Sequence, residues 1–260
     1  MMALLALLLL QAPASESKLI VSKVRPTLVD LGPARPDASY LPGDVMHVTF
    51  DVAGFALDPD GLYKYSAKLS VEDSAGKVIG SEDYGNGPAR LGVLGNGKSR
   101  FSFQLPIPTD QAPGNYKAKL VMGDANAKGT VTIEQAYKVV SPAFGFVRLQ
   151  TGRGPFGRSP TPCSGNVGEA LAFGFQLVGI SKGKDNNGNV DLTVEVQDSQ
   201  GKTLGKPQVS SFTNINATEP LSLTFEVPLD QAGQYKVVFK AMDKSNSRSA
   251  TMTVPIMVIE

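Results

Sequence analysis

The stretch PLDQAGQYKVVFKAMD, residues 228–243, decides the fold, because an earlier part of the chain nearly repeats it. Residues 106–124, PIPTDQAPGNYKAKLVMGD, place proline, aspartate, glycine and tyrosine in the same order before alternating apolar and polar residues. The segment PGDVMHVTFDV, which starts at Pro42, matches VGEALAFGFQL, which starts at Val167. In the same way LSVEDSAGKVI from Leu69 matches VEVQDSQGKTL from Val194, and both pairs are separated by 125 residues. One arrangement of secondary structure is therefore used twice.

The matching segments alternate apolar and polar residues with a period of two, which is typical of a strand with one buried face. The turn sequences DSAGK and DSQGK separate such segments and are suited to tight hairpins. The pattern predicts an all-β fold of two tandem immunoglobulin-like antiparallel β-sandwich domains. The apolar face expected of one strand and its counterpart comprises Met46, Val48, Phe50 and Val52, and Leu171, Phe173, Phe175 and Leu177.

The repeated DQA…GxY sequence is typical of a tyrosine corner, in which a tyrosine hydroxyl binds the backbone at the bend before the sixth strand. The aspartate is expected to open the corner, the glycine to allow the bend and the tyrosine to fix it. Two unrelated aromatic core residues are the alternative. The residues concerned are Asp110, Gly114 and Tyr116 in the first copy, and Asp230, Gly233 and Tyr235 in the second.

The N-terminus has the features of a secretion signal. An apolar run from Ala3 to Leu10 precedes Ala12-Pro13-Ala14, where a signal peptidase could cut. The run is too short to span a bilayer, and no later segment is long and apolar enough to do so. We expect a signal peptide at 1–14, one domain at 16–140 and another at 141–260, in an extracytoplasmic protein (periplasmic, cell-surface or secreted). An apolar N-terminal strand or buried helix is the alternative.

Four features resemble secreted tandem immunoglobulin-like β-sandwich proteins of planctomycete bacteria. They are the PGD or VGE before a strand, the D-S-x-G-K hairpin, the LP…GxY corner, and FGFVRL at residues 144–149. The resemblance covers nearly all of the mature chain, and its motifs are structural. That family has no assigned activity, so the resemblance implies the fold and an exported location alone.

Composition and residue pattern argue against several functions. Twenty-five basic and 24 acidic residues leave a net charge of +1, without the basic excess of nucleic-acid-binding proteins, so no nucleic-acid partner is expected. The only histidine, His47, is expected to face solvent, because it alternates with the apolar face of its strand. The only cysteine, Cys163, is expected to be a small packing residue. We therefore expect no enzymatic activity.

Two loop segments could bind a ligand. LDPDG and KDNNGNVD contain oxygen donors of the kind that calcium prefers, although exposed turns have the same composition. RLQTGRGPFGRSP contains three arginines that could bind an acidic polysaccharide or protein, or form a solvated linker. Calcium is the only cofactor considered. Its candidate ligands are Asp58, Asp60, Asp185, Asn187 and Asp191.

The sequence favours a non-enzymatic extracytoplasmic binding or structural protein. The alternative is an accessory module of a secreted enzyme or export complex. The expected partner is an envelope or extracellular protein or polysaccharide, held by loops or edges of one copy. We also expect each domain to fold alone.

Export is directly testable. Because the apolar run ends before Ala12-Pro13-Ala14, Edman sequencing of the mature protein from its native host should begin at or near Ser15. Recovery of intact Met1 from the cytoplasmic fraction would contradict an exported protein.

Overall fold

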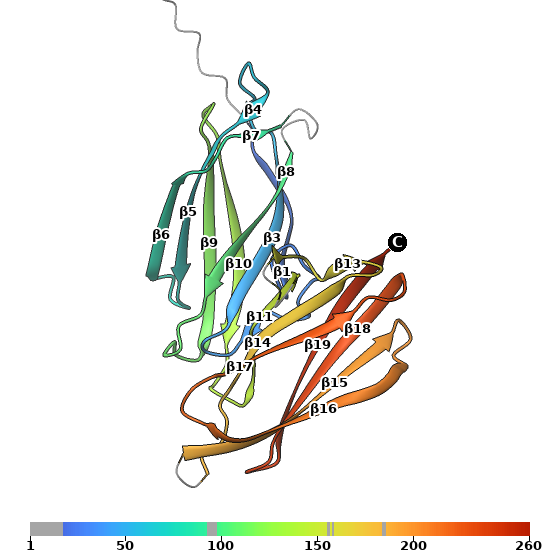
Figure 1. Ribbon diagram of the computed structural model, residues 1–260. Coiled ribbons are helices and arrows are strands. Elements are labelled where there is room, and N and C mark those ends of the chain that lie inside the picture. Colours follow the sequence, from blue (N-terminus) through green and yellow to red (C-terminus); the bar gives the residue numbers. More distant parts are fainter. Residues whose placement is uncertain (1–17, 93–97, 155–156, 158, 184–185) are drawn as a thin grey trace, which may run out of the picture.

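The chain folds into two β-sandwiches, which confirms the predicted fold class (Figure 1). The structure is a computed structural model that describes residues 18–92, 98–154, 157, 159–183 and 186–260. Sheets built from residues 20–139 form the first sandwich, and sheets built from residues 145–259 form the second. The predicted signal peptide lies outside the described residues.

The first sandwich consists of two facing sheets and a small extra pair of strands. One sheet contains, in spatial order, β1 (Ile20–Thr27), β3 (Val45–Ala53) and β8 (Ser99–Pro106). The other contains β2 (Ser39–Tyr40), β10 (Thr130–Val139), β9 (Gly114–Asp124), β5 (Tyr65–Glu72) and β6 (Val78–Asn86). The short strands β4 (Leu62–Tyr63) and β7 (Arg90–Leu91) pair with each other.

The second sandwich has the same strand order with one short strand added. Its first sheet contains β12 (Ser159–Pro160), β11 (Gly145–Arg153), β14 (Ala170–Val178) and β17 (Leu221–Pro228). Its second contains β13 (Ser164–Asn166), β19 (Arg248–Ile259), β18 (Gly233–Asp243), β15 (Asn187–Asp198) and β16 (Thr203–Asn216). In each sandwich one short strand runs parallel to its neighbour, and the other paired strands are antiparallel.

Each sandwich has its own apolar core, and the predicted apolar faces lie in it. Met46, Phe50 and their strand neighbours on that face are buried in the first core, as are Leu171, Phe173 and theirs in the second. Phenylalanines from facing strands pack against one another, for example Phe173 against Phe239 with ring centroids 5.5 Å apart. The alternation of side chains along each strand therefore does build the core.

Tyr116 and Tyr235, near the starts of β9 and β18, lie at corners and make hydrogen bonds of different lengths. The Tyr116 hydroxyl donates to the carbonyl oxygen of Ala112 at 2.8 Å, which is the geometry of a tyrosine corner. The Tyr235 hydroxyl is 3.4 Å from the carbonyl oxygen of Ala232, a much weaker bond. Tyr116 also stacks on Tyr137, with centroids 5.5 Å apart, so the first corner is joined to the core by ring packing.

The remaining corner residues have unequal roles. Gly233 has φ +151°, and a Cβ there would lie 3.1 Å from the Tyr235 hydroxyl oxygen, so glycine suits this bend. Gly114 has no positive φ, and a Cβ would make an ordinary contact 3.5 Å from the Tyr116 ring. The expectation that both glycines permit the bend is therefore wrong for Gly114. Asp110 and Asp230 are exposed at their corners.

The two corner tyrosines should differ in their effect on stability. Tyr116→Phe removes a well-formed hydrogen bond and should lower the free energy of unfolding of the first domain by about 1 kcal/mol. Tyr235→Phe should cost the second domain less, because its bond is long. Urea unfolding of both variants checks the order, and two equal costs would contradict it.

Candidate binding groove and the junction between the domains

A loop of the first sandwich reaches the second. Residues 28–35, here called the docking loop, follow β1 and fold back tightly. The N–H of Leu28 donates to the Pro33 carbonyl, and the N–H of Arg35 donates to the Pro26 carbonyl, both at 3.0 Å. This hairpin presents Leu28 and Val29 to the second sandwich, whereas Leu31 lines spaces on both domains.

Val29 of the docking loop belongs to the core of the second sandwich. It is 3% exposed and packs in the same apolar cluster as Leu149 and Ile256. Leu28 lines a cavity of about 440 Å³ with Leu149 and Met252. The docking loop therefore covers the side of the second sandwich where β11 and β19 meet, and burial of the Val29 side chain stabilises this contact by about 2 kcal/mol.

The Asp44 carboxylate joins the two domains by hydrogen bonds. Asp44 is 4% exposed, and its Oδ1 accepts the backbone N–H of Arg148 at 2.8 Å. The guanidinium of Arg35 donates to Oδ2 at 3.2 Å, which pairs the buried charge. The Nε of Arg148 also donates to the Gly43 carbonyl at 2.8 Å. These hydrogen bonds join the segment just before β3 to the bulge of β11.

A β-bulge directs Arg148 toward Asp44. The register of β11 against β14 shifts between Val147 and Gln150, and Arg148 has φ +56°. The first sandwich has the same feature in β1, where the register shifts after Ser22 and Lys23 has φ +57°. The Lys23 ammonium lies 3.8 Å from the Asp51 carboxylate of its own sandwich. The same bulge therefore serves an internal contact in one copy and the domain junction in the other.

Sequence reasoning did not identify the junction residues, although Asp44 lies in the repeated PGD or VGE motif. In the second copy Glu169 has this place, and its Oε2 lies 3.5 Å from Nε of Arg153 in the same domain. The different residue types near Asp44 and Glu169 were the available signal that the two acidic residues have different roles. The docking loop itself has no counterpart among the quoted repeats, so its contact required the structure.

His47 is buried, and the expectation that it faces solvent is wrong. It is 6% exposed, because the docking loop and the chain up to β3 lie over the outer face of β3. Burial lowers the pKa of His47, the carboxylates of Asp30 and Asp44 act to raise it, and Arg35 acts to lower it. The Nδ1 atom has no hydrogen-bond partner in the described structure. His47 therefore lies beneath the docking loop, in the part of the first domain that holds the junction.

The candidate calcium ligands are not brought together. Asp58 Oδ1 accepts the backbone N–H groups of Asp60 and Leu62, which is the work of a turn residue. Asp191 lies in the other domain, where a hydrogen bond from Ser211, followed by the ion pair with Lys244, lowers its pKa. No group of three potential metal-binding side chains occurs among the described residues.

Of the other two candidate ligands, the structure describes only Asn187. Asn187 begins β15 and pairs with Asn216, and Asp185 lies outside the described residues. Calcium binding stays a prediction.

Two buried aspartates that sequence reasoning missed end the repeated stretches. Asp124 Oδ2 accepts the N–H of Ala56 at 2.7 Å, and Asp243 Oδ2 accepts the N–H of Ser181 at 2.8 Å. Burial acts to raise the pKa of Asp243, but hydrogen bonds from Ser181, Ser245 and Arg248 together hold it below its usual value. Asp124 ties a loop to the end of β9, and Asp243 ties one to the end of β18, so their roles are structural. The shared final Asp of both stretches was the available signal.

The arginine-rich segment does not form one basic cluster in the described structure. Arg148 is at the junction, Arg153 binds the Ser164 carbonyl and Glu169, and Arg158 lies outside the described residues. Cys163 is 4% exposed, and burial raises the pKa of its thiol to about 12. The expectation of a packing cysteine is confirmed.

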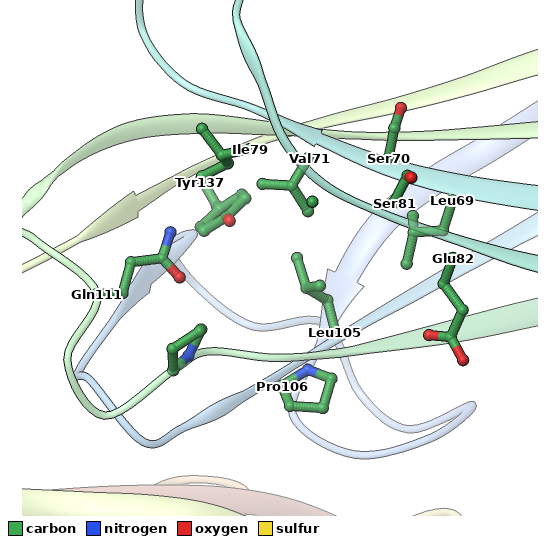
Figure 2. A pocket seen from close by; sticks show the side chains of 12 residues that line it. Leu69, Ser70, Val71, Ile79, Ser81, Glu82, Leu105, Pro106, Gln111 and Tyr137 are labelled. Carbon is green, nitrogen blue, oxygen red and sulfur yellow. The ribbon is translucent and has the colours of Figure 1, made fainter.

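The first sandwich has an open side between β6 and β8. Apolar side chains from four strands line a groove of about 230 Å³ there, and Figure 2 shows them facing a common space. A second space of about 550 Å³ lies beside Tyr65 and Phe103, lined by β6, by β8 and by Asp30 and Leu31 of the docking loop. The apolar side chains of the first part are Leu69, Val71, Ile79, Leu105 and Tyr137.

The second sandwich covers one end of its core with its own edge strand. Phe212 and Ile215 of β16 pack against the second core. All nine residues of β6, the outermost strand at the left of the first sandwich in Figure 1, are exposed. The large side chains of Ile79 and Tyr84 are 49% and 47% exposed. The first sandwich therefore presents an apolar groove beside a free strand edge.

Comparisons with known proteins give structural similarity only. No family model and no curated protein matches the chain. The C-terminal domain of the AgI/II polypeptide BspA from Streptococcus agalactiae matches at 11% identity and TM-score 0.31, over 90% of this chain and 100% of that one. Dimeric latent PorU from Porphyromonas gingivalis matches at 12% and 0.38, over 93% of this chain and 20% of that one.

Red sea bream transglutaminase matches at 10% identity and TM-score 0.28, over 93% of this chain and 31% of that one. TM-scores this low carry no argument about function, and the fold assignment rests on the strand order. Among the described residues no helix is long and apolar enough to cross a membrane.

Substitution of Val29 should weaken the second domain, although Val29 belongs to the first by sequence. Val29→Ala should lower the free energy of unfolding of the second sandwich by about 2 kcal/mol, because methyl groups leave its core. Native-state hydrogen exchange of β18 amides measures this. Val24→Ala is the matched control, because it removes methyl groups from the first core alone. Unchanged β18 protection in Val29→Ala would contradict the shared core.

Acid should weaken the first domain through His47. The unfolded chain binds a proton as pH falls through the ordinary histidine pKa of 6.5, whereas the folded chain keeps His47 neutral to lower pH. The stability is thus full above pH 6.5 and falls below it. Urea unfolding between pH 7.5 and 5.5 should show this decline in the wild type and a smaller one in His47→Gln. Equal slopes would contradict a buried neutral histidine.

Proposed function

We propose that the protein is a non-enzymatic extracytoplasmic binding or structural protein whose two immunoglobulin-like domains act as one rigid unit. The observation that carries the proposal is the insertion of Val29 from the first domain into the core of the second. A connection that is both packed and hydrogen-bonded limits the relative motion of the domains. Such a unit is suited to holding a partner at a fixed distance and angle.

The groove between β6 and β8 is the binding surface that we propose. Exposed apolar side chains beside a free strand edge are a common mark of an interaction site. The buried aspartates Asp44, Asp124 and Asp243 are engaged in holding loops and the junction. The envelope, either at the cell surface or in the periplasm, is the proposed location of the partner.

Site-specific photo-crosslinking in the native envelope tests this function. A benzophenone amino acid placed at Ile79 should give one discrete adduct with another macromolecule. The control position is Val209, which is 65% exposed on the edge strand β16 of the second sandwich. Equal adduct patterns from both positions, or a hydrolytic activity abolished by one acidic or serine substitution, would contradict the proposal.

A further inference from the structure

We propose that the groove binds an extended peptide strand of a partner protein, which pairs with the free edge of β6 and carries a lysine or arginine opposite Glu82. This inference rests on the proposed binding function and deepens it by giving the chemistry of the ligand. It follows from the backbone of β6, the shape of the groove and the charge along its wall.

The free edge of β6 provides backbone hydrogen-bonding groups. β6 is the last strand of its sheet and pairs only with β5 among the described strands. Residues Lys68–Val71 of β5 pair in regular register with Gly80–Asp83, between two irregular positions. The opposite edge of this regular segment lines the groove through Ile79, Gly80, Ser81 and Glu82. Its outward N–H and C=O groups can therefore pair with an added strand.

The other wall of the groove is less suited to strand addition. It is formed by the end of β8 and the following residues, including Pro106 and Pro108. Proline has no backbone N–H, so this wall lacks the donors of a regular ladder. The added strand should therefore extend the sheet that ends in β6, with β8 beside it as an apolar wall.

The groove can take every second side chain of that strand. Successive side chains of a strand point to opposite faces, so one set would enter between Val71, Ile79 and Leu105 while the other stays in solvent. Figure 2 shows the ring of Tyr137 and the side chain of Gln111 at one end of this space. The Nε2 atom of Gln111 is buried without a hydrogen-bond partner. A carbonyl oxygen of the bound strand could accept from it.

The second sandwich supports apolar side chains as the ligand. There, Phe212 and Ile215 of β16, which pair with Val190 and Gly188 at the start of β15, cover one end of the core. The docking loop gives a second example, because it covers another side of that sandwich with Val29. In the second sandwich, two parts of the core are thus covered by extended or hairpin segments that carry branched or aromatic side chains.

Charge along β6 selects the partner. Glu82 and Asp83 are adjacent and exposed. Asp83 accepts the N–H of Gly85 at 2.9 Å, and the Glu82 carboxylate, which accepts a hydrogen bond from the Tyr84 hydroxyl, keeps the negative charge that a cation would meet. Full-length antiparallel pairing of β6 (Val78–Asn86) with a second copy would place Glu82 opposite Glu82, which is unfavourable. A partner strand with a basic residue is therefore preferred over self-association.

The test uses a synthetic fluorescein-labelled peptide with the nine-residue length of β6. It has threonine at the solvent-facing positions and valine at the groove-facing positions, except for one lysine at the groove-facing position opposite Glu82, because directly opposite residues share a face. Fluorescence anisotropy with the full mature chain should show saturable binding. A peptide with glutamate in place of lysine should bind about fivefold more weakly. The lysine peptide with alternate backbone amides N-methylated should lose binding, because it cannot form the ladder.

Variants locate the binding on β6. Glu82→Lys should weaken the lysine peptide about fivefold and restore binding of the glutamate peptide, a reversal that a general loss of structure cannot produce. Ile79→Ser should abolish binding at an unchanged melting temperature, since Ile79 is 49% exposed. Glu219→Lys, at an exposed turn of the second domain, is the control with the same charge change.

Several outcomes would overturn the inference. No binding by either peptide up to millimolar concentration, binding that survives N-methylation, or no reversal in Glu82→Lys would each do so. A wild-type dimer in light scattering that Ile79→Ser dissociates would show a second copy in the groove instead. If crosslinking from Ile79 succeeds while the peptide tests fail, the binding function stands and strand addition is wrong. If crosslinking fails while the peptides bind as expected, the envelope partner is wrong.

Discussion

The buried carboxylate of Asp44 is the interaction on which the arrangement of the two domains depends. An unpaired buried charge would cost several kcal/mol, so Asp44 requires the N–H of Arg148 from one side and the guanidinium of Arg35 from the other. Arg35 ends the docking loop, which places Val29 in the second core. The ionic and apolar parts of the junction therefore support each other, and removal of either would expose groups that water must then solvate.

The duplicated fold has been used differently in its two copies. Both keep a bulge, in β1 and β11, and a buried aspartate at the end of β9 or β18. The bulge residue Lys23 contacts its own domain, whereas Arg148 contacts the other one. The second sandwich covers its β16 side with Phe212 and Ile215, and the first leaves the groove open. The conserved parts form the cores, and the divergent parts provide the junction and the proposed binding surface.

The sequence predicted the sandwiches well and the surfaces poorly, for a physical reason. Alternation with period two determines which side chains enter a core, and this local rule placed Met46, Phe50 and Phe173 correctly. The same rule placed His47 outside, because alternation identifies the face away from one core and cannot show that another segment covers that face. The docking loop and the groove arise from contacts between distant segments, and no local pattern encodes them.

The central claim is that the two domains form one rigid unit through Asp44 and Val29. Double electron–electron resonance between spin labels at Ser74→Cys and Glu219→Cys, exposed sites in the first and second domains, tests it directly, with buried Cys163 left unlabelled. The account predicts one narrow distance peak for the intact chain. A broad distribution, like that of two domains on a flexible linker, would contradict it.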